Sequence, residues 1–116
     1  MSLRREDFTL APAEVVLKDG RVARLRRLSA LERAQYLGRC KALGDGAKDG
    51  TPEQQLTALF TASGELVAMA LIDAEGVPLF TSGADAAGAM SEADLDELCD
   101  HIAKLNHIGA ANSPNA

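Results

Sequence analysis

The chain has 116 residues, 47% of them hydrophobic, and a formal net charge of −5 at neutral pH. This length forms one domain with a modest core. Its longest apolar run, residues 66–72, is far shorter than the roughly 18–20 residues that cross a bilayer. The arginines near the N-terminus precede no apolar segment, so we expect no signal peptide. We expect a single domain over residues 11–109, with a flexible arm at 1–10 and a disordered tail at 110–116.

Charge is distributed unevenly along the chain. Residues 1–50 hold 11 Lys and Arg against 7 Asp and Glu, whereas residues 51–116 hold one Lys against 10 Asp and Glu. Opposite poles of this kind are typical of a solvated surface, or they steer association between copies of the chain or with a charged partner. A nucleic-acid partner is disfavoured, because the chain is negative overall and only 3% of its residues are aromatic.

A β-hairpin is predicted over residues 13–27. Valines and leucines flank Asp19-Gly20 on both sides, and Asp-Gly suits a two-residue type I′ turn. Residues 77–80 are predicted as a short edge strand, since Pro78 cannot donate to a central ladder. We expect this strand to join the hairpin in a three-stranded sheet, with three helices packed on one side.

The first helix is predicted to begin after Ser29. Glu32, three residues on, completes a capping box. Gly44 stands where a left-handed residue would end the helix. Residues 44–51, with three glycines and two aspartates, are then expected to form a loop.

The second and longest helix is predicted to begin after Thr51 and to run to about Asp73. Pro52 stands at the first helical position, where its missing N–H costs nothing. Gly64, in the interior, marks either a close helix approach or a bend. Beyond Gly64 the helix is apolar nearly all round, so it is either central to the fold or covered by a partner. A loop of small residues is expected over 81–90.

The third helix is predicted to begin after Ser91, with Asp94 at its third position, and to end at Gly109. It carries a continuous apolar stripe. The stripe consists of Leu95, Leu98, Cys99, Ile102, Leu105 and Ile108. The fold class is therefore α+β.

No set of residues in the sequence is spaced for catalysis or for metal binding. His101 and His107 lie six residues apart, so one helix face cannot present both to a metal. Cys40 and Cys99 are read as buried thiols, with a disulfide between them as the alternative. The acidic residues of 94–100 favour the positive end of a helix dipole. We expect no catalytic residue, no metal, no cofactor and no enzymatic activity.

Three segments resemble the small tail assembly chaperones of long-tailed phages and prophages. They are L-K-D-G-R-V-A-R-L-R-R-L-S-A-L-E-R at 17–33, A-L-I-D-A-E-G-V-P-L-F at 70–80 and D-L-D-E-L-C-D-H-I-A-K-L-N at 94–106. The resemblance covers about 100 residues. It implies a protein of the bacterial cytoplasm that binds the tape measure protein and keeps it soluble until tail-tube subunits polymerise around it. The tail-tube protein is then a further partner.

The predicted partner surface is apolar, and its alternative interpretation is the core of the domain itself. It consists of Leu66, Val67, Met69, Ala70, Leu71, Leu79 and Phe80. Apolar residues all round one helix also predict self-association or a groove for a partner helix.

Two other functions stay open. One is a permanent structural component of a phage tail or head–tail junction. The other is a small nucleic-acid-binding regulator. Its basic residues would be Arg21, Arg24, Arg26 and Arg27.

Overall fold

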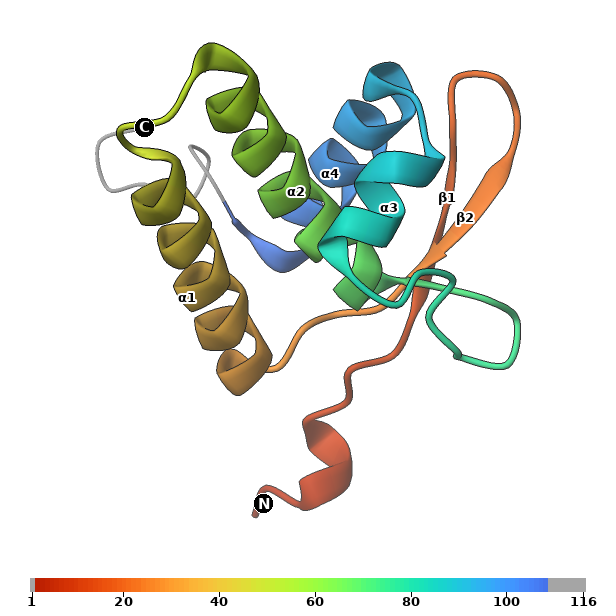
Figure 1. Cartoon of the computed structure of the whole chain (residues 1–116). Coiled ribbons are helices and arrows are strands. Elements are labelled where there is room, and N and C mark those ends of the chain that lie inside the picture. The colour runs from red at the N-terminus through yellow and green to blue at the C-terminus, as the bar shows by residue number, and fades with distance from the viewer. Residues whose placement is uncertain (1, 109–116) are drawn as a thin grey trace.

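The computed structural model describes residues 2–108, and its fold is α+β, as expected (Figure 1). The antiparallel sheet has the strand order β1-β2-β3. Its strands are β1 (Ala13–Val16), β2 (Val22–Leu25) and β3 (Leu71–Ile72). The helices are α1 (Ala30–Ala47), α2 (Pro52–Ala70), α3 (Gly83–Ala89) and α4 (Glu92–Asn106), and a 3-10 turn spans Arg5–Asp7.

The predicted hairpin is confirmed, but its turn is of another type. Ala13 pairs with Leu25, and Val16 with Val22. The Leu17 N–H donates to the Arg21 carbonyl at 2.8 Å, and the Gly20 N–H donates to the Leu17 carbonyl at 2.9 Å. Only Gly20 in this loop has positive φ, +92°, whereas type I′ needs two such residues. The connection is therefore a three-residue loop with a bulge at Gly20.

The third strand is not the predicted one. Leu71 and Ile72, expected at the end of the second helix, instead pair with Leu25 and Arg24 of β2. Residues 77–80 lie on the far side of β3, where Pro78 forms an isolated bridge with Ile72. The second helix therefore ends at Ala70, because tertiary pairing with β2 outweighs its local helical preference.

The predicted helix starts are confirmed. Ser29, Thr51 and Ser91 each accept a hydrogen bond from the backbone N–H three residues on. The predicted ends are less accurate. The first helix continues past Gly44 to Ala47, which removes half of the expected loop. The last helix ends at Asn106, because His107 adopts the left-handed conformation with φ 54°, and Gly109 lies outside the described residues.

The segment predicted as a small-residue loop contains α3. Its N-cap is Ser82, whose hydroxyl accepts from the Asp85 N–H at 3.1 Å. The reason for its small residues is its contact with α2. A Cβ added to Gly64 would stand 2.2 Å from the Gly83 carbonyl oxygen, so the two backbones touch. Of the two readings of Gly64, the close approach is the correct one.

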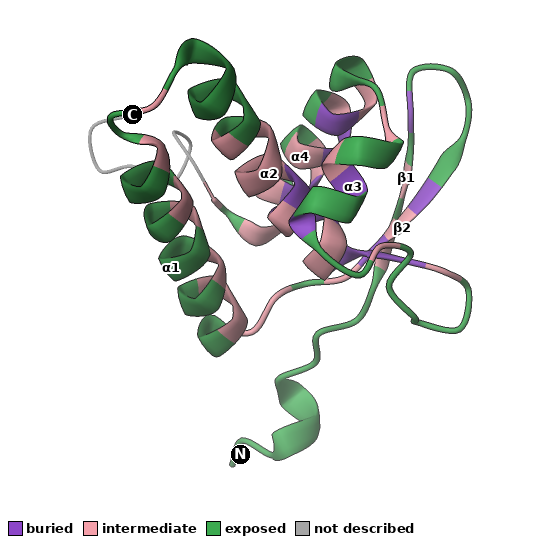
Figure 2. Cartoon of the chain, viewed as in Figure 1, coloured by how far each residue is buried: buried purple, intermediate pink, exposed green. Residues whose placement is uncertain are grey.

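The core lies where the sheet meets α4 and the second half of α2 (Figure 2). Leu25, Val67 and Ile102 are its largest fully buried side chains. By contrast, none of the 18 residues of α1, all of which the structure describes, is buried. Residues 2–10, the predicted arm, are all exposed, and the predicted tail lies outside the described residues. Within residues 2–108, no helix has both the length and the apolar character to cross a membrane.

Candidate interaction groove

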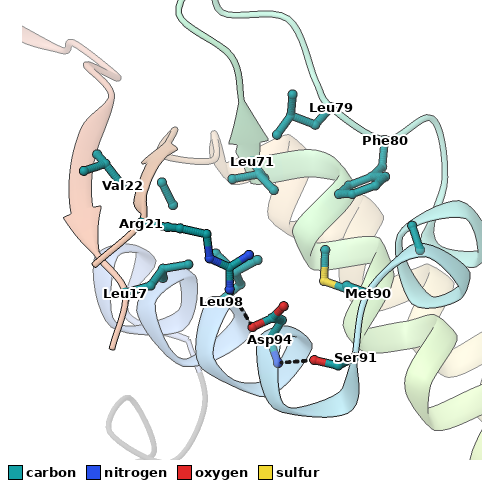
Figure 3. Close-up of a pocket in the computed structure, with 12 residues that line it drawn as sticks. Leu17, Arg21, Val22, Leu71, Leu79, Phe80, Met90, Ser91, Asp94 and Leu98 are labelled. Carbon is teal, nitrogen blue, oxygen red and sulfur yellow. Dashed lines mark hydrogen bonds and ion pairs between the residues drawn. The ribbon is translucent and has the colours of Figure 1, made fainter. Parts of the chain in front are cut away.

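A groove opens between the sheet, residues 79–80 and the junction of α3 with α4 (Figure 3). We call it the strand groove. It has a volume of about 370 Å³. Its lining consists of Leu17, Arg21, Val22, Ala23, Leu71, Leu79, Phe80, Ala89, Met90, Ser91, Asp94 and Leu98. Nine of these twelve residues are apolar, so the surface favours contact with apolar side chains.

Apolar atoms at the mouth of the strand groove are open to solvent. Val22 is 60% exposed and Leu79 is 52% exposed, whereas Leu71 at the base is only 7% exposed. Figure 3 shows Leu71, Phe80 and Met90 around one common space. The groove therefore offers a buried apolar base beneath a rim of exposed apolar residues. That arrangement is typical of sites that receive anchoring side chains from a partner.

The polar side chains of the strand groove bind one another. Arg21 Nη2 donates to Asp94 Oδ1 at 2.9 Å, and Ser91 Oγ accepts from the Asp94 N–H at 3.1 Å. Arg21 Nε also donates to Asp19, and the hydrogen bonds that the guanidinium donates to the two carboxylates raise its pKa. The backbone N–H of Arg21 donates to the Asp19 carboxylate, and this hydrogen bond is the main reason that the pKa of Asp19 is lowered. These pairs are exposed, so their net effect on stability is small.

Six of the seven residues predicted to bind a partner fall into two groups. Leu66, Val67 and Ala70 are buried in the chain's own core, so they present no surface in this structure. Leu71, Leu79 and Phe80 come together in the strand groove.

The seventh residue, Met69, is half-buried, and its carbonyl accepts a hydrogen bond from Arg26 Nη1 at 2.8 Å.

Val22 and Met90 also line the groove, although the sequence predicts neither as a contact residue. The sequence predicts Val22 in a strand and Met90 in a loop. An apolar residue two positions after Gly20, in the arginine-rich segment 21–27, was the one available signal for Val22. Nothing local indicated Met90, because its place follows from α3, which brings it beside Phe80.

The four arginines of the nucleic-acid alternative do not form one free basic surface. Arg21 is bonded to two carboxylates, and Arg26 Nη2 lies 2.6 Å from both oxygens of Glu32. Arg24 is half-buried, and its Nε has no hydrogen-bond partner among the described residues. Arg27 is exposed. The charge available to phosphate is therefore smaller than the sequence count indicates.

The histidines and cysteines lie apart from the strand groove. His101 Nε2 is 4.0 Å from Glu97, and His107 is the C-cap of α4. Both thiols are free and half-buried. Cys99 Sγ lies 3.3 Å from the Ser63 carbonyl, and burial raises the pKa of this thiol to about 11. Among residues 2–108, no three His, Cys, Asp or Glu side chains gather to hold a metal ion.

Comparison with protein-family models, with curated proteins and with solved structures finds no match for this chain. The function must therefore be argued from the residues and their arrangement.

Proposed function

We propose that this chain is a phage tail assembly chaperone that holds an apolar helical segment of the tape measure protein in the strand groove. The observation that carries the proposal is the lining of this groove, in which Leu71, Leu79 and Phe80 form one apolar surface with Val22. Helical partners dock in such grooves through apolar side chains spaced three or four residues apart. The resemblance of residues 17–33, 70–80 and 94–106 to these chaperones supports the choice of partner.

The shape of the strand groove supports a partner side chain rather than a small polar ligand. A volume of about 370 Å³ is at the small end of the range for ligand sites, about 300–1,000 Å³. Such sites also use polar groups that point at the ligand. Here Arg21 and Ser91 are each bonded to Asp94. An incoming leucine or phenylalanine needs no polar partner.

The proposal is tested by co-expression with the tape measure protein of the same gene cluster, followed by a pull-down at low and at high salt. We expect retention that survives high salt, because apolar contacts are not screened. We also expect the tape measure protein to move from the pellet to the supernatant. No retention and no gain in solubility would overturn the proposal.

A matched pair of variants locates the contact. Leu79→Asp places a charge at the mouth of the groove, and since Leu79 is 52% exposed, the fold should tolerate it. Leu31→Asp makes the same change at a residue of α1 that is 70% exposed and lies outside the groove. We expect only Leu79→Asp to abolish retention. Equal loss with both variants, or with neither, would place the contact elsewhere.

A further inference from the structure

A second surface of the molecule, separate from the strand groove, is the free edge of β1. β2 is the central strand, and both of its edges are paired, with β1 and with β3. No described segment pairs with the outer edge of β1. The bond from the Leu17 N–H to Arg21 fixes which backbone groups point inward. Hydrogen-bonded pairs alternate along an antiparallel ladder, so Ala13 and Val15 bond β2, whereas the N–H and C=O groups of Glu14 and Val16 point outward.

This edge borders a groove whose opposite wall is α4. The groove, which we call the edge groove, is lined by Val16 and Lys18 on the strand side and by residues 93–104 on the helix side. The Lys18 N–H donates to Glu97 Oε2 at 2.7 Å, which closes the edge at its turn end. Glu14 and Val16 are both exposed, and Val16 lines the groove.

The α4 wall of the edge groove is acidic. Four carboxylates line the groove, against Lys18 and Lys104. Asp94 and Asp100 have close cationic partners, Arg21 and Lys104, each at 2.9 Å. Asp96 is exposed, and Glu97 has the Lys18 N–H and, at 4.0 Å, His101. A strand beside β1 would therefore lie in a negative field.

We propose that the edge of β1 takes a further strand from a partner segment that is extended and rich in lysine or arginine. The backbone of the segment would bond Glu14 and Val16, which is the mode of strand addition at a free sheet edge. Its cationic side chains would face Asp96 and Glu97 of α4. Binding here does not depend on the strand groove, so this surface can hold a second segment of a partner or another protein.

A second copy of this chain fits the edge less well. Pairing two β1 strands about a two-fold axis keeps both sheets' inner faces on the same side. The two α4 helices would then approach each other with their acidic faces, and like charges so placed repel. Charge complementarity thus selects a basic segment over a second copy.

The probe is a short blocked peptide that alternates lysine and threonine, added to the full chain at low ionic strength. We expect the amide exchange of Glu14 and Val16, followed by NMR, to slow at least about tenfold at saturation. Two control peptides carry the same sequence with glutamate for lysine, or with alternate backbone amides methylated. Neither should slow these amides. Equal effects of all three peptides would overturn the proposal.

Variants of the chain test each half of the site. Val16→Pro removes an outward N–H and leaves the β1–β2 bonds in place, so we expect affinity to fall about fivefold. Asp96→Lys should weaken binding about threefold at low salt, whereas Glu53→Lys, the same charge change on α2, should not. Slow exchange of Glu14 and Val16 without peptide, together with a dimer mass, would assign the edge to a second copy instead.

Discussion

The two halves of α2 belong to one continuous helix but have different surroundings. In the second half, Gly64, Leu66, Val67 and Ala70 are buried. In the first half, Leu56 and Leu59 are 52% and 59% exposed, although they continue the same apolar stripe. Figure 2 shows this change along the helix.

The difference follows from what covers each half. In the buried half, Gly64 touches α3 and the Ser63 carbonyl lies against Cys99 of α4. In the exposed half, Gln55 and Leu59 line a shallow groove with α1, which has no buried residue. Stability should therefore be concentrated at the sheet end of the molecule. The α1–α2 end, with few buried apolar contacts, should open locally at lower free energy.

The largest expected effect comes from a core truncation matched with an exposed one. Ile102→Ala removes a fully buried side chain of α4 and should lower the free energy of unfolding by about 2–5 kcal/mol. Leu59→Ala on the exposed half of α2 should change it by less than about 1 kcal/mol. Urea unfolding measures both. Similar losses at the two positions would contradict the division of α2 into a supporting half and an exposed half.

The crossing of α2 and α3 should be the next most sensitive point. Gly64→Ala places a Cβ against the Gly83 carbonyl, where the backbone must shift, and we expect a loss of about 1–3 kcal/mol. Gly38→Ala on α1 is the control, because nothing lies within 4 Å of the added Cβ. Urea unfolding of the two variants should move in opposite directions. A tolerated Gly64→Ala would mean that the two backbones do not touch in solution.

Features encoded by neighbouring residues were predictable from the sequence. Helix starts at Ser29, Thr51 and Ser91 depend on hydrogen bonds that span three residues, and all three were predicted correctly. The hairpin was also predicted, because Asp-Gly between two segments rich in valine and leucine is a local signal. Its turn type was not, since Asp19 keeps a negative φ.

Features that depend on distant parts of the chain were not predictable in this way. The sequence predicts Leu71 and Ile72 as the end of an apolar helix. In the structure they instead form backbone hydrogen bonds with β2. Residues 83–89 look like a loop because they are small, yet their smallness is what lets α3 approach Gly64. The strand groove combines segments that only this packing brings together. Leu71, Leu79 and Phe80 were predicted to contact a partner. They were predicted as part of a surface that also included residues now found in the core.

The ion pair of Arg26 and Glu32 joins the end of β2 to the start of α1, and its contribution should depend on pH. Burial alone would raise the pKa of Glu32, but the hydrogen bonds from Arg26 and Ser29 outweigh it, so the pKa lies below its ordinary value of 4.5. A carboxyl with a lowered pKa stabilises the fold above 4.5, and this contribution is lost as the pH falls through the folded value.

Glu32→Gln tests this pair. The amide keeps an oxygen for the Ser29 N–H but loses the charge that faces Arg26. We expect a loss of about 1–2 kcal/mol at pH 7, measured by urea unfolding, and a smaller loss in acid. Asp45→Asn removes the exposed pair with Lys41 and should cost almost nothing. A loss at Glu32 that is constant with pH would indicate that its charge is not involved.

The smallest effect is expected at Gly44. Like the Gly38 control, this substitution should raise the free energy of unfolding. The structure places Gly44 inside α1 with open space around it, so Gly44→Ala should stabilise the chain by about 0.5–1 kcal/mol. If Gly44 instead ended the helix with positive φ, as the sequence alone predicts, alanine there would be strained and would destabilise. Gly76→Ala is the reference for that case, since Gly76 has φ +84°. The sign of the change at Gly44 therefore decides between a helix that ends at Gly44 and one that continues to Ala47.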